Sequence, residues 1–436
     1  MKMKVTLSLV ALAAFACLAA FGLRSAHAAN TLLVDDDHVQ CPLATFTTIQ
    51  AAVNAANPGD TVQVCAGAYH ELVTVNKSVT LKGAQAGADA RTRAAVPATE
   101  SVVDGNGGTT SFDVTASGVT IDGFTVQGTT NANQFGAGIV LAQGTAGAHV
   151  VNNIIQNNLV GLFLSNNSAS SQAVIRHNLF SNNNQPGPAS GAGIYTDTFV
   201  GGGVVRNVLI DSNKFVGNSD AGIDFSGGAP GAETSINISA NEFDSNSRAL
   251  FLLDMTSSSI TLNTMKNATE PSTGDIRIFG GVSGLTVTCN TMQNGAGRAV
   301  RISDGIGGDP NSNIAINDNN ISGYAGAGLE VLSGGYTGTL NAERDWWGSP
   351  TGPTATGNPG GTGEAIVDPD GVVDFTPFRT APVPDVDNDG ILDTCDSQVG
   401  PPANKDQCKD SGWQNFNFPR TFKNQGDCIQ YVNTGK

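Results

Sequence analysis

The middle of the chain repeats a short pattern of apolar and polar residues. A β-branched residue is usually followed by a polar residue, then by Asn or Asp, and then by Phe, Ile or Met, as in VIRHNLF, NISANEF and SITLNTM. The Asn and Asp positions of this pattern are Asp122, Asn153, Asn178, Asn213, Asn241, Asn263, Asn290 and Asn319. Each run is too short to bury its apolar face alone. The repeat therefore predicts stacked coils of a parallel β-solenoid.

The asparagines of this pattern are expected at a bend between two strands. Asn tolerates the left-handed backbone angles of a bend, and amides stacked in register can form a hydrogen-bonded ladder. A β-sandwich also has short strands and turns, and it is the alternative fold. The Asn-centred repeat favours the solenoid.

A second apolar run follows each bend, as in GIYTD, GIDFS and DIRIF. Strand alternation places its first and third apolar residues inward and the residue between them outward. The predicted outward column is Val140, Phe163, Tyr195, Asp224, Phe251, Arg277, Arg301 and Glu330. The next outward column includes Asp197, Ser226, Leu253, Phe279 and Ser303. One sheet face is thus expected to carry aromatic rings, carboxylates and guanidinium groups together.

The two ends of the repeat region carry a family resemblance. Near the start, Thr47 or Thr48 is expected to cap a short helix whose Ile49 and Val53 face the core. The matching motifs are Ile49-Gln50-Ala51-Ala52, Pro58-Gly59-Asp60 and Gly67-Ala68-Tyr69-His70-Glu71, with DWWGSPTGP and GGTGEAIVDPDGVVDFTPF at the end. This resembles the pectin-lyase-like family over about Thr31 to Phe378. The resemblance implies an all-β, right-handed single-stranded parallel β-helix. The predicted fold adds the short N-terminal capping helix and a small C-terminal module, which lies outside the resemblance.

The resemblance specifies the fold better than the activity. The family includes pectate lyases, polygalacturonases, pectin methylesterases and alginate epimerases. The sequence contains no Gly-His-Gly of the hydrolases, no Asp-Pro-His-Asp of the epimerases and no Arg-x-Pro-x-x-Arg of the lyases. Asp368-Pro369-Asp370-Gly371 approximates the epimerase motif poorly and lies in the wrong place. No catalytic motif of the family is therefore predicted.

The outward columns still hold candidate chemistry. Asp197 and Asp224 are expected on neighbouring coils with their carboxylates roughly 8 Å apart, and an inverting glycosidase needs about 6.5–9.5 Å. Arg277 and Arg301 are expected to bind a uronate carboxylate in bidentate fashion. The predicted substrate-binding residues are Phe163, Tyr195, Phe251, Arg277 and Arg301. An ordinary solvated sheet face is the competing interpretation.

Three functional hypotheses follow. The first is a secreted β-helix protein that binds an extracellular polysaccharide or cell-wall glycan, or acts at the cell surface. The second is a polysaccharide lyase or glycoside hydrolase that uses Asp197, Asp224, Arg277 and Arg301. The third is a structural or adhesive extracellular element. A monomer is expected.

A twelve-residue acidic stretch, DVDNDGILDTCD, follows the repeats. Asp385, Asp387, Asp389, Asp393 and Asp396 occupy positions 1, 3, 5, 9 and 12, and Gly390 occupies position 6. With the Ile391 carbonyl at position 7, this is the spacing of a calcium loop with oxygen ligands. The flanks are rich in proline and cannot form EF-hand helices. The stretch resembles a single thrombospondin type 3 repeat, so a structural Ca²⁺ is expected.

The first 28 residues are expected to be a cleaved export signal. Lys2 and Lys4 precede an apolar segment, and Ala26-His27-Ala28 fits the cleavage rule. Cleavage changes the formal charge from −16 to −19, because three basic residues and no acids are lost. Such a charge opposes binding to nucleic acid or anionic membranes. No later apolar run is long enough to span a membrane, so a secreted protein is predicted.

Export permits disulfides among the six remaining cysteines. We expect Cys41 to pair with Cys65, and Cys408 with Cys428, because each pair brackets a compact segment. Cys289 is interpreted as a small buried residue, and Cys395 has no assigned partner. The tail is aromatic and basic and resembles a small module of secreted bacterial proteins. The predicted organisation is a leader (1–28), a β-helix (29–380), a calcium-binding linker (381–402) and a small C-terminal module (403–436).

Overall fold

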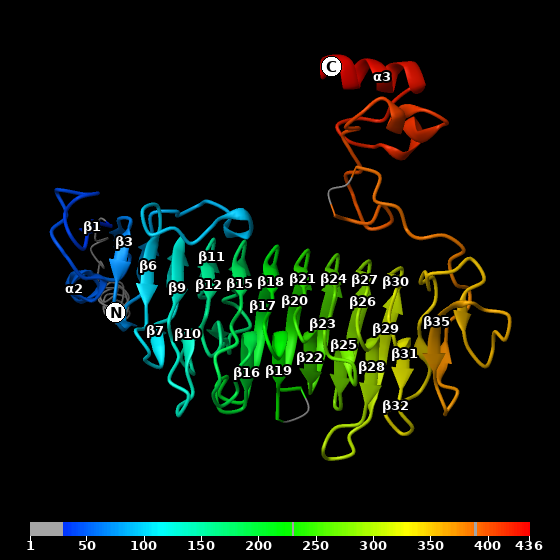
Figure 1. The fold of residues 1–436 in the computed structure, drawn as a ribbon, viewed down its shortest axis with the longest axis horizontal. Helices are drawn as coiled ribbons and strands as arrows, with labels where there is room; N and C mark the ends of the chain where they lie inside the picture. Colours follow the sequence, from blue (N-terminus) through cyan, green and yellow to red (C-terminus); the bar gives the residue numbers. More distant parts are fainter. Residues whose placement is uncertain (1–28, 229–230, 388–389) are drawn as a thin grey trace, which may run out of the picture.

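Three parallel β-sheets wind around one apolar core and form an elongated solenoid (Figure 1). The computed structural model describes residues 29–228, 231–387 and 390–436. The predicted export signal lies outside these residues, and so does Asp389 of the predicted calcium loop. Each coil visits the three sheets in the order A, B, C. Every pairing between the named strands is parallel, as stacked coils require.

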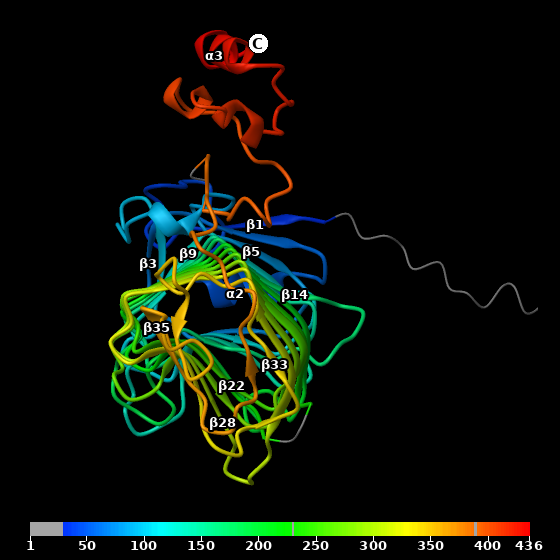
Figure 2. The same ribbon diagram turned by 90° about the vertical axis from the view of Figure 1, so that its right-hand side faces the viewer.

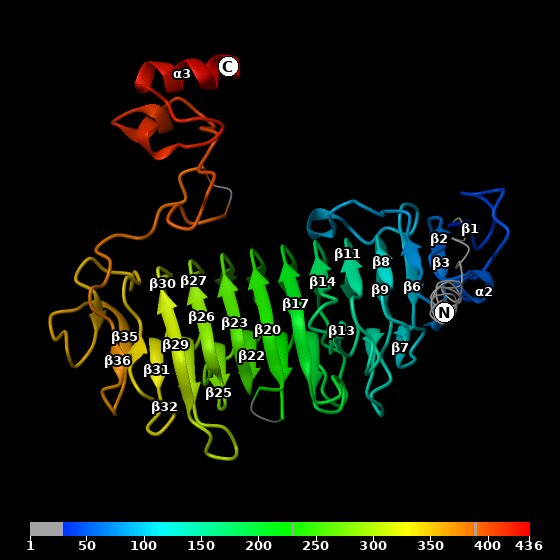
Figure 3. The same cartoon turned by 180° about the vertical axis from the view of Figure 1, so that it is seen from behind.

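Sheet A supplies the longest strands, which lie side by side in Figure 3. Its members are β1 (Thr31–Val34), β2 (Thr61–Val64), β5 (Thr80–Lys82), β8 (Thr120–Asp122), β11 (His149–Val151), β14 (Ala173–Arg176), β17 (Val205–Asp211), β20 (Glu233–Ser239), β23 (Met255–Thr261), β26 (Ser283–Thr288), β29 (Asn311–Asn317), β32 (Tyr336–Thr337), β33 (Leu340–Asn341) and β36 (Val373–Asp374).

Sheet B follows sheet A across a tight bend. Its members are β3 (Gly67–Tyr69), β6 (Ser101–Asp104), β9 (Phe124–Gln127), β12 (Ile154–Gln156), β15 (Leu179–Ser181), β18 (Lys214–Val216), β21 (Glu242–Asp244), β24 (Thr264–Lys266), β27 (Thr291–Gln293) and β30 (Asn320–Ser322). Behind it, the rings of Phe180, Phe215 and Phe243 stack with centroids 4.9 and 4.8 Å apart. These stacked rings fill the lumen of the solenoid.

Sheet C closes each coil. Its members are β4 (Val73–Val75), β7 (Thr110–Val114), β10 (Ala137–Leu141), β13 (Leu162–Phe163), β16 (Ala192–Asp197), β19 (Ala221–Ser226), β22 (Arg248–Leu253), β25 (Gly274–Phe279), β28 (Arg298–Ser303), β31 (Ala327–Val331), β35 (Gly363–Val367) and β34 (Pro353–Thr354). Figure 2, seen along the stack, shows the coils lying behind one another in register.

A short helix covers the first coils, as predicted. In α2 (Ile49–Ala55), the Ala51 N–H donates to the Thr48 hydroxyl, and Ile49 and Val53 are fully buried. Glu71 accepts hydrogen bonds from the backbone N–H groups of Ile49 (2.7 Å) and Gln50 (3.0 Å). A carboxylate at a helix N-terminus satisfies donors that have no partner within the helix. The end of the Gly67–Glu71 motif is therefore a structural cap.

The predicted asparagine ladder runs along the bend between sheets A and B. The Asn178 side chain is typical. Its Oδ1 accepts the Asn153 N–H (2.9 Å), and its Nδ2 donates to the Val150 carbonyl (2.8 Å) and to Asn213 Oδ1 (2.9 Å). The ladder comprises Asn153, Asn178, Asn213, Asn241, Asn263, Asn290 and Asn319, and it ends on Asp345. All of these residues are buried.

Two parts of this prediction were wrong. Asp122 is not a ladder member, because it lies in β8 opposite Val151, and Phe124 occupies the ladder position of its coil. The asparagines also do not supply the left-handed bend. The residue before each one does so, for example His177 (φ 55°) and Cys289 (φ 60°). Asparagine is required here for its hydrogen bonds.

A second ladder lies at the bend between sheets B and C and was not predicted. It comprises Asn158, Asn183, Asn218 and Asn246, and Thr129 starts it. Each of these asparagines follows a ladder asparagine of the first bend by five residues. That spacing was a signal that sequence reasoning missed.

The chain leaves the solenoid after β36 and turns back over the bend between sheets A and B. It ends in a module with η2 (Asp406–Cys408), η3 (Gly412–Asn415) and α3 (Gln425–Thr434), whose small core includes Cys408, Phe416 and Phe422. A short η1 (Ala90–Thr92) lies in an early loop. In the part of the chain that the structure describes, no helix is long and apolar enough to cross a membrane.

Three disulfides link the six cysteines of the described chain. Cys41–Cys65 and Cys408–Cys428 form as predicted. The third bridge joins Cys289 to Cys395 and corrects two predictions, since Cys289 is not a free buried residue and Cys395 has a partner. Strand periodicity does not encode the return path of the linker, so this pairing was not visible in the sequence.

Candidate functional site

The outward face of sheet C is the candidate site, and its register matches the prediction. Tyr195 pairs with Asp224 in β16 and β19, and Phe251 pairs with Arg277 in β22 and β25. The remaining pairs of the column are Val140 with Phe163, Phe163 with Tyr195, Asp224 with Phe251, Arg277 with Arg301 and Arg301 with Glu330. The eight predicted residues therefore form one continuous column.

Arg277 lies between two phenylalanine rings. Its guanidinium carbon is 5.0 Å from the ring centroid of Phe251 and 4.4 Å from that of Phe279. Within the described residues, no carboxylate lies within ion-pair distance of Arg277, and its Nε is buried with no hydrogen-bond partner. Burial, then the neighbouring Arg248 and Arg301, lower the pKa of Arg277. An arginine remains protonated under these conditions, so this is a point of positive charge suited to an anion.

The neighbouring arginines are already engaged. Arg248 pairs with Asp220 at 3.2 Å. Arg301 pairs with Glu330 at 2.8 Å, and Arg298 shares the same carboxylate at 3.1 Å. The prediction that Arg277 and Arg301 together bind one carboxylate of a ligand is thus not supported, because Arg301 already has a partner. Arg301 is neutralised by Glu330 on the next coil, and Arg277 carries the available charge.

A hollow of about 510 Å³ lies beside this cluster, at the ends of β19, β22, β25 and β28. Phe251, Leu253, Phe279 and the almost fully exposed Ile306 line its apolar side, and Asp254 and Asp309 also border it. Its volume lies within the range of small-molecule binding sites. The site thus combines a cation, two aromatic rings and a concave surface.

Asp224 is buried, and its surroundings favour the protonated carboxyl. Its side chain is 6% exposed, and the Ser226 hydroxyl donates to its Oδ1 at 2.5 Å. Burial, with a further contribution from Asp220, raises the pKa of Asp224 to about 8. A carboxyl with this pKa donates rather than accepts a proton at neutral pH, as general acids do.

Asp197, the second predicted carboxylate, is tied to the protein through both oxygens. Its Oδ2 accepts the Tyr195 hydroxyl at 2.9 Å, and its Oδ1 accepts the Val200 N–H at 2.6 Å. Burial and the adjacent Asp197 raise the pKa of Tyr195. The structure therefore places Asp197, Tyr195 and Asp224 on adjacent strands, as predicted, with Asp197 also fixing the following loop.

Two of the predicted substrate-binding rings, Phe163 and Phe251, are less exposed to solvent than expected. Phe163 is 5% exposed, because Val200 of the loop after β16 packs on it, and Phe251 is 9% exposed beneath Arg277. Loop conformations determine this cover, and strand periodicity does not predict them. The exposed rings on this face are instead Phe135 (51%) and Phe199 (68%), which sequence reasoning missed because both lie in loops.

One buried acid of this region was also missed. Glu233 begins β20, is 2% exposed, and has an Oε2 without a hydrogen-bond partner. Burial and the carboxylates of Asp254 and Asp224 raise the pKa of Glu233 to about 8. Acids are rare at such interior positions. The residues that pair with Glu233 on the neighbouring strands, Val205 and Met255, are both apolar.

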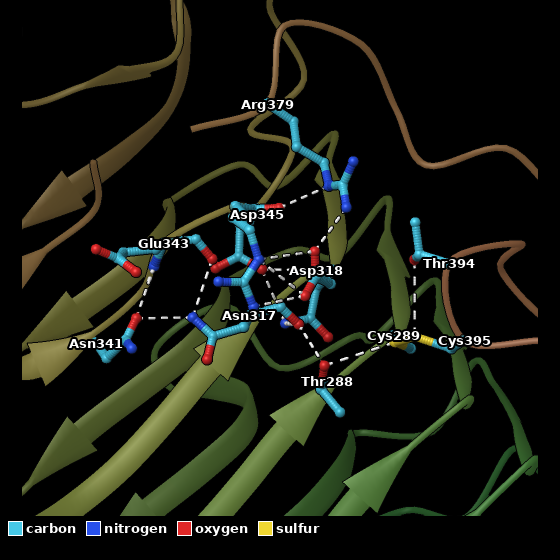
Figure 4. A network of polar contacts seen from close by, with 12 residues as sticks. Thr288, Cys289, Asn317, Asp318, Asn341, Glu343, Asp345, Arg379, Thr394 and Cys395 are labelled. Carbon is cyan, nitrogen blue, oxygen red and sulfur yellow. Dashed lines mark hydrogen bonds and ion pairs between the residues drawn. A yellow bond between two sulfur atoms is a disulfide. The ribbon is translucent and has the colours of Figure 1, made fainter. Parts of the chain in front are cut away.

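The acidic linker loop is fastened to the solenoid on both sides (Figure 4). Before it, Arg379 pairs with Asp318 at 2.6 Å, and Val383 exchanges two hydrogen bonds with the Asn320 side chain. After the candidate ligand Asp393, Cys395 is bonded to Cys289. The return path of the linker is therefore fixed against coils of the solenoid.

Within this loop, the charges of three described acids act on Asp393, although the described loop acids do not lie together at the spacing of metal ligands. Burial first, then the charges of Asp387, Asp385 and Asp396, raise the pKa of Asp393. Gly390 has φ 92°, which gives the sharp turn expected at position 6. A second acidic group, Asp35, Asp36 and Asp37, has carboxylate oxygens within 4.8 Å of one another near the N-terminus.

One comparison with known proteins agrees with this architecture. A family model described as the right handed beta helix region matches residues 190–343, which include Asp197, Asp224 and Arg277. A search of curated proteins by sequence gave no match.

Among solved structures, similar ones include an alginate lyase from Paenibacillus sp. str. FPU-7 (17% identity, 72% of this chain and 99% of that chain, TM-score 0.49). Two others are the Dettilon tailspike protein gp208 (14%, 74% and 69%, TM-score 0.47) and the pectate lyase Pel9A (13%, 81% and 80%, TM-score 0.41). The matched region and the observed coil topology show that the chain folds as a right-handed parallel β-helix.

Proposed function

We propose that this is an exported β-helix protein that binds an acidic extracellular polysaccharide along the outward face of sheet C. The observation that carries the proposal is Arg277, a cation between Phe251 and Phe279 with no carboxylate partner among the described residues. A guanidinium donates two parallel hydrogen bonds to a carboxylate, and aromatic rings pack against the apolar faces of sugars. A uronic acid unit offers both partners to one site.

Charge and covalent chemistry support this class of ligand. The formal net charge of −16 opposes association with nucleic acid, whose binding depends on neutralising many phosphates. Arg277 has no carboxylate partner among the described residues, so it suits one carboxylate of a ligand. All six cysteines of the described chain form disulfides, which is typical of proteins in oxidising compartments.

Calorimetric titration with hexamers of galacturonate and mannuronate tests the proposal, with maltohexaose as the neutral control. We expect binding of at least one uronate hexamer, and a loss of about 10- to 100-fold in affinity for Arg277→Ala. Arg277→Lys is expected to retain part of the affinity, since it keeps the charge but loses the bidentate geometry. Arg176→Ala removes an ion-paired arginine from sheet A and is the matched control.

Two results contradict the proposal. One is a wild-type protein that binds neither uronate hexamer. The other is an Arg277→Ala variant that binds as tightly as Arg176→Ala. Thermal unfolding of all variants shows whether each is folded before it is titrated.

Cleavage of the bound polysaccharide is the second candidate function, and Asp224 is the observation that favours it. A carboxyl with a pKa of about 8, beside Asp197 on the adjacent strand, suits protonation of a glycosidic oxygen. The test is release of reducing ends, or of unsaturated ends, from the same hexamers. Release that Asp224→Asn abolishes establishes cleavage, and hexamers that stay intact while bound leave binding as the function.

A structural role is proposed for the acidic linker loop. Asp385, Asp387, Asp389, Asp393, Asp396 and the Ile391 carbonyl would hold a Ca²⁺ ion, and their calcium-loop spacing in the sequence, with the sharp turn at Gly390, supports this. The ion would offset their mutual repulsion and stiffen the junction. We expect Ca²⁺ to raise the midpoint of thermal unfolding and the chelator EDTA to reverse the rise. An equal response in Asp393→Asn would contradict the assignment.

A further inference from the structure

The hollow beside Arg277 has an acidic border that the binding of a uronate does not use. Asp254 follows β22 directly and is 6% exposed, and Asp309 lies in the exposed loop after β28. None of the described residues that line the hollow is an arginine, a lysine or a histidine. The rings of Phe251 and Phe279 form part of the same lining. The hollow thus offers negative charge and apolar surface together.

A third acid, Glu233, lies behind the wall of this hollow. Its side chain is 2% exposed, and its Oε2 has no hydrogen-bond partner among the described residues. This oxygen lies against Gly227, a wall residue, where a Cβ atom would collide with it. In the same way, a Cβ atom on Gly281 would collide with Asp254 Oδ1. Two glycines thus make room for two carboxyl groups at the edge of the hollow.

The charges of these acids are not compensated by the protein. No ion pair between described residues includes Glu233, Asp254 or Asp309. Burial first, then the carboxylates of Asp254 and Asp224, raise the pKa of Glu233 to about 8. Burial and the charge of Asp309 raise the pKa of Asp254. A cation placed among these acids would favour their ionised forms and offset their repulsion.

The lining of the hollow suits an organic ammonium group and not a metal ion. Within the described chain, only Asp35, Asp36 and Asp37 bring three carboxylate oxygens together at the spacing of metal ligands, and they lie near the N-terminus. Calcium takes about six to eight oxygen ligands, whereas this lining is partly aromatic. An ammonium group has three N–H donors for carboxylates, and aromatic rings such as Phe279 attract a cation and pack against the carbon atoms beside it.

The acidic hollow and Arg277 are close enough for one glycan to reach both. Arg277 pairs in register with Phe251, and Asp254 lies three residues further along the chain. At the usual rise of a β-strand, this separation is about 10 Å. Neighbouring units of an oligosaccharide can span it. A carboxylate at Arg277 and an ammonium group in the hollow can therefore belong to one molecule.

We propose that this hollow binds the protonated amino group of a hexosamine unit, in the same polysaccharide whose carboxylate is bound by Arg277. Asp254 and Asp309 accept hydrogen bonds from the amino group, Glu233 supplies negative charge from behind the wall, and the sugar ring covers Phe279. The inference rests on the proposed function, and it specifies a glycan that carries both carboxylates and free amino groups.

The test compares two hexamers of alternating glucuronate and glucosamine, one with free amino groups and one fully N-acetylated. Both carry the same carboxylates, so they differ only at the amino groups. In calorimetric titrations, we expect the wild type to bind the free-amine form about 10- to 100-fold more tightly. Arg277→Ala should weaken the binding of both forms, since both place a carboxylate on this arginine.

Three isosteric variants locate the gain. Asp254→Asn should remove most of it, and asparagine tolerates the left-handed φ of 57° at this position. Asp309→Asn, at an exposed position, should reduce it by about 2- to 5-fold. Glu233→Gln should also reduce it, but less than Asp254→Asn does, because Glu233 acts from behind the wall. Asp374→Asn removes the same charge from an exposed position on β36 of sheet A and is the matched control, which should keep the full gain.

Each outcome separates this inference from the proposed function. If both hexamers bind equally well through Arg277, or if Asp254→Asn and Asp374→Asn reduce the gain alike, the inference is wrong and the proposed function stands. If the free-amine form gains affinity through Asp254 while Arg277→Ala changes nothing, the proposed function is wrong and the ammonium site stands. If neither hexamer binds, the inference is wrong, and the galacturonate and mannuronate hexamers decide the proposed function separately.

A free polyamine is the other source of an ammonium group, and spermidine is the probe for it. We expect spermidine to bind much more weakly than the free-amine hexamer, because it has no sugar ring to cover Phe279 and no carboxylate for Arg277. Spermidine that binds as tightly as this hexamer, and is lost in Asp254→Asn, would assign the hollow to polyamines and overturn the inference.

Discussion

The bend between sheets A and B and the outward face of sheet C are built on the same coils but follow opposite rules. The bend repeats one residue, and seven buried asparagines from Asn153 to Asn319 make nearly the same hydrogen bonds. The face changes residue at each step, from Phe163 through Asp224 to Arg277. Repetition at the bend maintains the stack, whereas variation on the face gives each coil a different chemistry.

This difference follows from what each position contacts. A ladder asparagine must satisfy the backbone of the coils on both sides, so other side chains leave buried polar groups without partners. An outward residue of sheet C contacts solvent, loops or a ligand, so its identity is not constrained by the stack. Changes at the bend should therefore affect stability, and changes on the face should affect binding.

The largest expected effect comes from breaking the ladder in mid-stack. Asn263→Ala removes the acceptor of the Asn241 N–H and Nδ2 and the donor to the Ile238 carbonyl, all of which are buried. At about 1–3 kcal/mol for each unsatisfied group, we expect the free energy of unfolding to fall by at least about 4 kcal/mol. Denaturant unfolding measures it.

Two controls sharpen this comparison. Asn237→Ala makes the same substitution at an exposed position of sheet A and should change the free energy of unfolding by less than about 0.5 kcal/mol. Arg277→Ala on the face should cost less than about 1 kcal/mol while reducing glycan affinity. A face variant as destabilising as the ladder variant would break the distinction between the two regions.

The next effect concerns the bridge that fastens the linker to the same bend. Cys289 and Cys395 are 106 residues apart in sequence, and closing a loop of this length restricts the unfolded chain strongly. Replacing both by serine should lower the free energy of unfolding by about 2–5 kcal/mol. It should also make the segment after Pro384 more sensitive to limited proteolysis. Unchanged proteolysis would show that Arg379 and Val383 suffice to hold the linker.

The stability of the fold is expected to depend on pH through Glu233, the buried acid at the start of β20. The folded pKa of Glu233 is about 8, above its ordinary value of 4.5. The folded protein thus binds this proton more tightly than the unfolded chain does. The contribution to stability is complete below about pH 4.5 and is lost as the pH rises through about 8.

Thermal unfolding between pH 5 and pH 8.5 checks this sign. The wild-type midpoint should fall over this range, and Glu233→Gln should fall less, because glutamine has no proton to lose. A variant whose pH profile runs parallel to that of the wild type would show that other groups cause the decline.

The smallest effect is predicted where the ladder ends. Asp345 accepts from Asn319 as a ladder asparagine would, but its Oδ2 has no hydrogen-bond partner, and burial raises its pKa far above the ordinary value. Asp345→Asn should supply a side-chain N–H donor at the position from which the ladder asparagines donate to a backbone carbonyl. It should stabilise the protein by about 1 kcal/mol near neutral pH. Reduced stability would show that the ladder needs a different terminus.

Features that follow the repeat could be predicted from the sequence more reliably than features that do not. The eight-residue outward column was predicted in full, because strand alternation and a constant bend fix which side chains point out. Asp122 was misplaced because the repeat begins irregularly there, with Gly123 and Phe124 in place of the usual asparagine. The second ladder had a regular spacing in the sequence and was overlooked.

Contacts that depend on non-repeating segments could not be predicted. Phe163 is covered by Val200 through the fold of the loop after β16. Phe135 and Phe199 meet only because two loops converge. The covering of the predicted rings and the position of the exposed rings thus depend on parts of the chain that do not repeat.

Hydrogen–deuterium exchange with and without the bound uronate hexamer tests the central claim most directly, because it locates the ligand on the solenoid. The account predicts added protection in the loops and strand ends of β19, β22, β25 and β28, with the bend between sheets A and B unchanged. Protection confined to sheet A, to sheet B or to the C-terminal module would contradict it.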